Sequence, residues 1–182
     1  VVNTALDNAD GRRTLSTLLI DSHGPRVVYH KQHLSGYEQE YFTPGKHGAS
    51  LRFGEVEAGV AICYDASFPE HARAAALDGA ALYLISAAFF PGGEQRRDLY
   101  AAARALDNGM YVAFSGATGD CAEERFVGGS AIYDPEGRVL VRMGAETGVV
   151  SADVDLRLVA ATRAAHPMLA ERRADLGVRR LF

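Results

Sequence analysis

Two short stretches of this 182-residue sequence place reactive side chains directly after apolar runs. Residues 59–70 read GVAICYDASFPE, so Cys63 follows a short apolar run and precedes a proline-led helical stretch. A cysteine between a strand and a helix can present its sulfur as a nucleophile beside free backbone N–H groups. Free cysteine is also among the residue types most often buried as an inert apolar side chain. Position alone leaves both interpretations of Cys63 open.

The second stretch, YHKQHL at residues 29–34, puts Lys31 directly after another apolar run. The segment GYEQEYFTPG follows it and contains the carboxylate of Glu38. A nearby ammonium stabilises a thiolate or a developing oxyanion, and a carboxylate can take a thiol proton. The alternative for Lys31 is a solvated surface charge, which is the usual state of lysine. The set needs no histidine, and we expect His71, one turn into the helix after the cysteine, to lie at the surface.

Composition predicts a folded globular domain, since 48% of the residues are hydrophobic and 23% are charged. A net charge of -4 and a pI near 5.9 argue against a nucleic-acid partner or an anionic membrane surface. No apolar run approaches the roughly 20 residues of a membrane span. Cys63 and Cys121 show no disulfide pattern, which favours reduced thiols and a cytoplasmic location. His30 and His33 lack accompanying thiol or carboxylate ligands, so we expect no metal site.

Strand-like runs alternate with helical stretches, which is typical of an α/β domain with helices over a mixed sheet. Strands are predicted at residues 15–21, 26–29, 51–53, 57–62, 82–86, 111–114, 130–133, 138–142 and 148–154. Helices are predicted at residues 69–77, 96–108 and 156–164. In the second helix, the helical spacing predicts one apolar face that packs on the core. That face consists of Leu99, Ala102, Ala103 and Leu106.

Six motifs in this order resemble those of the carbon–nitrogen hydrolase (nitrilase) superfamily, from about residue 15 to the C-terminus. YHKQHL is similar to the family's lysine motif, and YEQEYFTPG is similar to the glutamate segment that follows it. GVAICYDASFPE is similar to the nucleophile motif. The remaining three are GAALYLISAAFF, AARALDNGMYVAFSGATG and FVGGSAIYDPEGRVL. Together, at sensible spacing, they make a specific resemblance.

The resemblance implies a four-layer α-β-β-α sandwich and a Glu-Lys-Cys triad that acts on a non-peptide C–N bond without a cofactor. In these terms Cys63 is the nucleophile, Lys31 the catalytic lysine and Glu38 the second glutamate near the active site. The backbone N–H of Tyr64 would bind the oxyanion. The family's general-base glutamate lies upstream of the lysine motif, and no segment of this chain matches it. We therefore expect residues 1–182 to be a single carbon–nitrogen hydrolase domain that lacks its N-terminal part.

The Tyr-Asp pair after Cys63 looks more like the amidase and carbamoylase branches than like the true nitrilases. The expected substrate is therefore a small amide or N-carbamoyl compound, hydrolysed by water through a thioester. Tyr37, Phe89 and Phe90 are candidates for lining the substrate pocket, with ordinary core packing as the alternative. The resemblance also implies a homodimer or a larger homo-oligomer. Three other functions stay open: a nitrilase for a small nitrile, a soluble acyltransferase, and a non-catalytic scaffold of the same fold.

Overall fold

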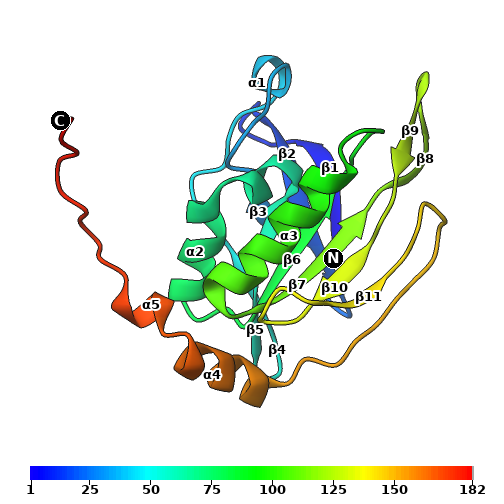
Figure 1. Cartoon of the computed structure of the whole chain (residues 1–182). Helices are drawn as coiled ribbons and strands as arrows, with labels where there is room; N and C mark the ends of the chain where they lie inside the picture. The colour runs from blue at the N-terminus through cyan, green and yellow to red at the C-terminus, as the bar shows by residue number, and fades with distance from the viewer. Residues whose placement is uncertain (182) are drawn as a thin grey trace.

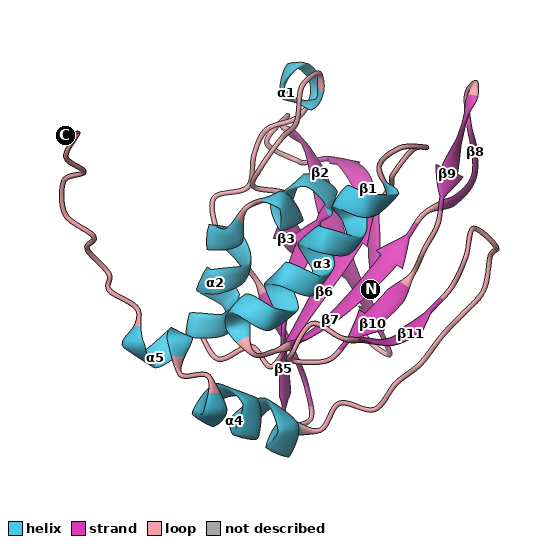
Figure 2. Ribbon diagram, in the orientation of Figure 1, coloured by secondary structure: helices cyan, strands magenta, loops and turns pink. Residues whose placement is uncertain are grey.

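The computed structural model describes residues 1–181 and shows two sheets packed face to face, with helices over one of them (Figures 1 and 2). The smaller sheet has antiparallel strands in the order β1-β2-β3. Their bounds are β1 (Val2–Asp7), β2 (Arg13–Asp21) and β3 (Gly24–His30). The larger sheet contains β4 (Ser50–Phe53), β5 (Val56–Ile62), β6 (Leu82–Ala87), β7 (Tyr111–Gly116), β10 (Ala131–Tyr133) and β11 (Val139–Arg142).

The larger sheet runs in the order β11-β10-β7-β6-β5-β4 and mixes both kinds of pairing. The strands β5, β6 and β7 are parallel, and the outer pairs are antiparallel. Helices α2 (Pro69–Leu77) and α3 (Glu94–Asn108) connect the parallel strands, as parallel pairs require. They lie in front of the larger sheet in Figure 1, and the smaller sheet lies behind it.

Shorter elements complete the described chain. They are α1 (Glu38–Tyr41), the 3-10 turn η1 (Cys63–Ser67), the hairpin β8 (Thr118–Cys121) and β9 (Glu124–Val127), α4 (Leu156–Ala165) and α5 (Met168–Glu171). Beyond α5 the chain leaves the body as an extended tail (Figure 2). The β8–β9 hairpin, α1 and α5 were not predicted from the sequence.

Strand β5 is buried on both faces, which explains its continuous apolar sequence. Ala61 belongs to the cluster between the larger sheet and its helices. Val60 and Ile62 belong to the cluster between the two sheets, together with Tyr29 of β3. Cys63, directly after this strand, packs against both clusters. The cysteine therefore sits where the two cores meet.

The predicted strands and hairpins before residue 143 are confirmed, but the strand predicted at 148–154 is wrong. This segment has no strand assignment, and Val149 is 94% exposed. An apolar alternation becomes a strand only where a neighbouring strand supplies hydrogen bonds, and the segment pairs with no strand among residues 1–181. The described layers are one of helices and two of strands, and the expected fourth layer stays a prediction.

The prediction of which face of α3 is buried is also wrong. Leu99 and Leu106 are 61% and 48% exposed, so the two large apolar side chains of that face point outward. The buried residues are Arg97, Ala101, Arg104, Ala105 and Asn108. The two alanines let the helix approach the sheet closely, and the arginines hydrogen-bond to backbone carbonyls inside. A pattern that counts only apolar residues misses an inward face made of alanine and arginine.

We expect Ala105→Leu to lower the free energy of unfolding by about 1–3 kcal/mol, because a larger side chain overpacks the interface between α3 and the sheet. Leu99→Ala, on the exposed face of the same helix, is the control and should change it by less than about 0.5 kcal/mol. Urea unfolding measures both. A larger loss of unfolding free energy for Leu99→Ala than for Ala105→Leu would support the buried face that was predicted from the sequence.

Candidate active site

Lys31 lies directly after β3, and its side chain is only 1% exposed. Its Nζ donates to Oε1 and Oε2 of Glu38 at 2.7 and 2.6 Å. An unpaired ammonium in this position would cost several kcal/mol of desolvation, so the pair is what allows a charged lysine inside the protein. The solvated-charge interpretation of Lys31 is therefore wrong.

Glu38 begins the short helix α1 and is surrounded by donors. Besides the two bonds from Lys31, it accepts from the backbone N–H and the hydroxyl of Ser35, at 2.7 and 3.0 Å. A carboxylate offers about four acceptor positions, and here four donor contacts use them. The geometry makes Glu38 the anchor of Lys31, and leaves it poorly suited to take a proton from the cysteine.

Cys63 is half-buried and has a φ of +48°, in the left-handed region that non-glycine residues rarely adopt. Such a conformation costs about 1–3 kcal/mol and persists only where the surroundings fix it. The residue before it is fixed, because the N–H of Ile62 donates to Oδ2 of Asp65 at 3.0 Å. The strained backbone at this half-buried cysteine favours the nucleophile interpretation, which stays a prediction.

Cys63 and Tyr64 are the first two residues of η1. The first N–H groups of any helical segment have no acceptor within it, so these two backbone donors are not used by the turn itself. The two N–H groups belong to the cysteine itself and to the next residue, so they are close to the sulfur in sequence. Chemically, the arrangement can offer backbone donors to an oxyanion formed on a carbonyl carbon that the sulfur attacks.

Asp65 is the centre of a buried hydrogen-bond network, and its side chain is completely buried. Its carboxylate accepts from the Tyr29 hydroxyl at 2.8 Å, the Ile62 N–H at 3.0 Å, the His33 N–H at 2.9 Å and the His33 Nδ1 at 3.0 Å. Two of these donor residues flank Lys31, and a third precedes Cys63. One carboxylate thus ties the lysine segment to the cysteine turn, although the sequence motifs gave no sign of this role.

His71 is buried, so its predicted surface position is wrong. Its Nε2 lies 2.9 Å from the hydroxyl of Tyr29, and its Nδ1 lies 2.7 Å from the hydroxyl of Tyr83. Burial lowers the pKa of the His71 imidazole, nearby Asp65 raises it, and His33 lowers it further. Burial also raises the pKa of both tyrosine hydroxyls, which therefore keep their protons. Helical spacing could not reveal partners that lie on two different strands.

The three aromatic candidates for the pocket make different contacts. Tyr37 precedes α1 and is 74% exposed. Phe89 packs on Phe114 with ring centroids 6.1 Å apart, and Phe90 packs on Phe126 at 5.2 Å. Their role in substrate binding stays a prediction.

A hollow of about 510 Å³ opens where the two functional segments meet. His33 and Leu34 line it from the segment after Lys31, and Tyr64 and Phe68 line it from the turn after Cys63. The ring of His33 stacks on that of Phe68 at a centroid distance of 3.9 Å. The volume and the mixed polar and aromatic walls suit a small molecule.

The sequence and the fold both match known proteins. The carbon–nitrogen hydrolase family matches residues 3–164, so the chain belongs to this family. It is 36% identical over 151 residues to the 2-oxoglutaramate amidase of Bacillus subtilis, covering 81% of this chain and 58% of that protein. Nit3 of Saccharomyces cerevisiae, a member of branch 10 of the nitrilase superfamily, matches with a TM-score of 0.84 and 27% identity, covering 94% of this chain and 64% of Nit3.

A third similar protein is a variant of the amidase from Nesterenkonia sp. AN1, solved with acrylamide added to its active-site cysteine. It matches with a TM-score of 0.78 and 31% identity, covering 94% of this chain and 65% of the amidase. The chain spans 51% to 60% of the length of eight curated relatives. No helix within residues 1–181 is both long and apolar enough to cross a bilayer. In the same residues, no group of three or more His, Cys, Asp or Glu side chains is placed to hold a metal ion.

We expect Glu38→Gln to lower the free energy of unfolding by about 2–4 kcal/mol, because it leaves the buried ammonium of Lys31 without a charged partner. Glu40→Gln removes an exposed charge from the same short helix and should change stability by less than about 0.5 kcal/mol. Urea unfolding of both variants measures the difference. Equal costs would mean that the Lys31–Glu38 pair adds nothing to the fold.

Proposed function

We propose that this protein hydrolyses a small amide or N-carbamoyl compound through a thioester on Cys63. The observation that carries the proposal is the buried Lys31–Glu38 pair, which lies on the segment that Asp65 ties to the strained cysteine turn. Burying a lysine costs free energy that an ordinary structural role does not require, so the buried pair favours a functional role for Lys31.

The proposed reaction begins when a base takes the proton of the Cys63 thiol and the sulfur attacks the carbonyl carbon. The ammonium of Lys31 and the N–H of Tyr64 stabilise the oxyanion. The C–N bond then breaks, and ammonia or an amine leaves with the proton that the base held. Water cleaves the thioester, which releases the acid and restores the thiol. The family resemblance assigns the base to a glutamate upstream of the lysine motif, and no residue of this chain is given that role.

The relatives favour an amide over a nitrile as the substrate. The Bacillus subtilis relative is named for an amide substrate, and the Nesterenkonia relative is named as an amidase. The hollow between the two segments is of a size for a small molecule. Tyr37, Phe89 and Phe90 stay proposed lining residues of the substrate pocket. The proposal includes the four-layer sandwich, a homodimer or larger assembly, and a cytoplasmic reaction that needs only substrate and water.

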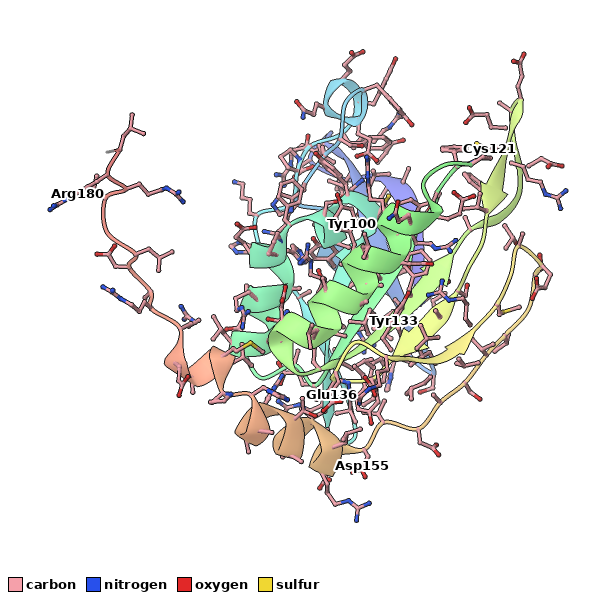
Figure 3. The ribbon with its side chains drawn as sticks, viewed as in Figure 1. Tyr100, Cys121, Tyr133, Glu136, Asp155 and Arg180 are labelled. Atoms are coloured by element: carbon pink, nitrogen blue, oxygen red, sulfur yellow. The ribbon has the colours of Figure 1, made fainter. Side chains whose placement is uncertain are left out.

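We expect Cys63→Ala to lower kcat/KM for amide hydrolysis by at least about 10³-fold, because the nucleophile is lost. Cys121→Ser is the matched control and should leave the rate within about twofold, because Cys121 is exposed on the β8–β9 hairpin (Figure 3). Ammonia release from a panel of aliphatic amides, N-carbamoyl amines and nitriles measures both.

The same panel separates the alternatives. Release that survives in Cys63→Ala would contradict the mechanism. Release from nitriles in preference to amides would make the protein a nitrilase. An acyl product that forms with an added amine, faster than with water, would make it an acyltransferase. No turnover of any compound by the unmodified protein would favour the scaffold.

A further inference from the structure

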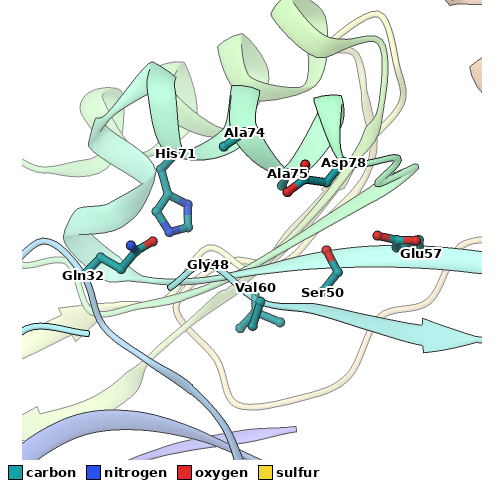
Figure 4. Close-up of a pocket in the computed structure, with 10 residues that line it drawn as sticks. Gln32, Gly48, Ser50, Glu57, Val60, His71, Ala74, Ala75 and Asp78 are labelled. Atoms are coloured by element: carbon teal, nitrogen blue, oxygen red, sulfur yellow. The ribbon is translucent and has the colours of Figure 1, made fainter. Parts of the chain in front are cut away.

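His71 is a buried titratable group that the proposed reaction does not use. It lies on α2, and Figure 4 shows its ring directed from this helix toward the sheet. The ring fills the space between two buried tyrosine hydroxyls, those of Tyr29 on β3 and Tyr83 on β6. An apolar side chain could fill this core position without the free-energy cost of desolvating an imidazole. The hydrogen bonds to the two tyrosines therefore explain why a histidine is found here.

The number of protons fixes the direction of each hydrogen bond. A carboxylate only accepts, so the Tyr29 hydroxyl uses its single hydrogen to donate to Oδ2 of Asp65 at 2.8 Å. The contact between Tyr29 and Nε2 of His71 at 2.9 Å then needs a hydrogen from the ring. The neutral ring that carries its proton on Nε2 leaves Nδ1 free to accept from Tyr83 at 2.7 Å. The hydrogen bonds therefore run from Tyr83 to His71, then to Tyr29, and end on Asp65.

Asp65, where these hydrogen bonds end, connects the segment of Lys31 with the turn of Cys63. Asp65 holds the N–H of Ile62, the residue before Cys63. It also holds the N–H of His33, two residues after Lys31. Whatever orients Tyr29 toward Asp65 therefore affects how the lysine segment meets the cysteine turn.

We propose that His71, as the neutral tautomer with its proton on Nε2, is a positioning residue of the thiol site. It directs the hydroxyl of Tyr29 onto Asp65 and so holds the segment of Lys31 against the turn of Cys63. The inference rests on the proposed role of Cys63 as the nucleophile. His71 itself touches neither the substrate nor the sulfur in this account.

Protonation of the ring would disturb this arrangement. A hydrogen on Nδ1 would face the Tyr83 hydroxyl, whose own hydrogen would then lose its acceptor in a fully buried position. The charged and titratable groups around the ring are Tyr29 from β3, His33 from the segment after β3, Asp65 from η1, Tyr83 from β6 and, next to Tyr83, Arg104 from α3.

Low pH should therefore destabilise the hydrogen bonds that position Tyr29 and Asp65. The pKa of His71 in the folded protein lies below the ordinary value of 6.5, mainly because the ring is buried. The unfolded chain thus takes up this proton first as the pH falls. The stabilising contribution of neutral His71 is complete above pH 6.5 and is lost as the pH falls through its lowered pKa.

The test compares His71→Gln with His71→Asn, both in a Cys121→Ser background that leaves Cys63 as the single thiol of this sequence. The longer glutamine can place an amide N–H near the position of Nε2 and reach Tyr29. The shorter asparagine reaches only the Tyr83 side. The measurements are the rate of Cys63 alkylation by iodoacetamide, followed on the Cys63 peptide by mass spectrometry, and kcat and KM on an amide.

We expect His71→Asn to lower both the alkylation rate and kcat by about tenfold or more at pH 7.5, with KM nearly unchanged. The alkylation rate and kcat of His71→Gln should stay within about threefold of those of the protein with His71 unchanged. The kcat of His71→Gln should also fall less steeply below pH 6.5. If the asparagine variant does not fold, Tyr83→Phe takes its place, because it removes the donor that fixes the tautomer and should likewise slow alkylation.

Two results would overturn the inference. One is an equal alkylation rate and an equal kcat in the glutamine and asparagine variants. The other is an unchanged alkylation rate of Cys63 in a folded Tyr83→Phe variant. The alkylation assay does not need turnover, so the two proposals can fail separately. Slower alkylation in His71→Asn, with no amide turned over by the unmodified protein, would sustain the role of His71 and contradict the amidase.

Discussion

A single buried carboxylate, that of Asp65, connects the parts of the molecule on which the proposed chemistry depends. A buried anion is costly unless its acceptor positions are filled, and here four donor groups fill them. Because these donors come from β3, from the segment around Lys31 and from the end of β5, satisfying the charge fixes the three segments relative to one another. The same bond to Ile62 helps to hold Cys63 at its unusual backbone angle. The strain at the cysteine and the burial of the carboxylate are therefore coupled.

The two-sided burial of β5 explains why the site lies where it does. One face of this strand packs under α2 and α3, and the other packs on the smaller sheet, so its end cannot shift without disturbing both cores. Lys31, directly after the last strand of the smaller sheet, has its own fixed partner in Glu38. The rigid strands hold the cysteine and the lysine, and polar bonds across the sheets adjust their geometry. Functional groups on packed elements with supporting hydrogen bonds are held more accurately than groups on free loops.

Local sequence signals predicted the strands and hairpins well, because apolar alternation and turn residues act over a few positions. Cys63, Lys31 and Glu38 were predicted as site residues from short motifs, and their catalytic roles stay predictions. The ion pair between Lys31 and Glu38 is a finding of the structure. The errors have a common physical origin in contacts between distant segments. The inward face of α3 depends on carbonyls that accept from Arg97 and Arg104, and His71 depends on hydroxyls from two strands. The segment 148–154 shows the reverse case, in which a strand-like sequence finds no partner.

In the proposed reaction an acyl group passes through the sulfur of Cys63. Rapid acid quenching of a reaction with an amide substrate, followed by peptide mass spectrometry, tests it directly. We expect the peptide containing Cys63 to gain the mass of the acyl group during turnover, and hydroxylamine to remove it. Product formation with no acyl adduct on Cys63, or with the adduct on another residue, would rule out Cys63 as the nucleophile.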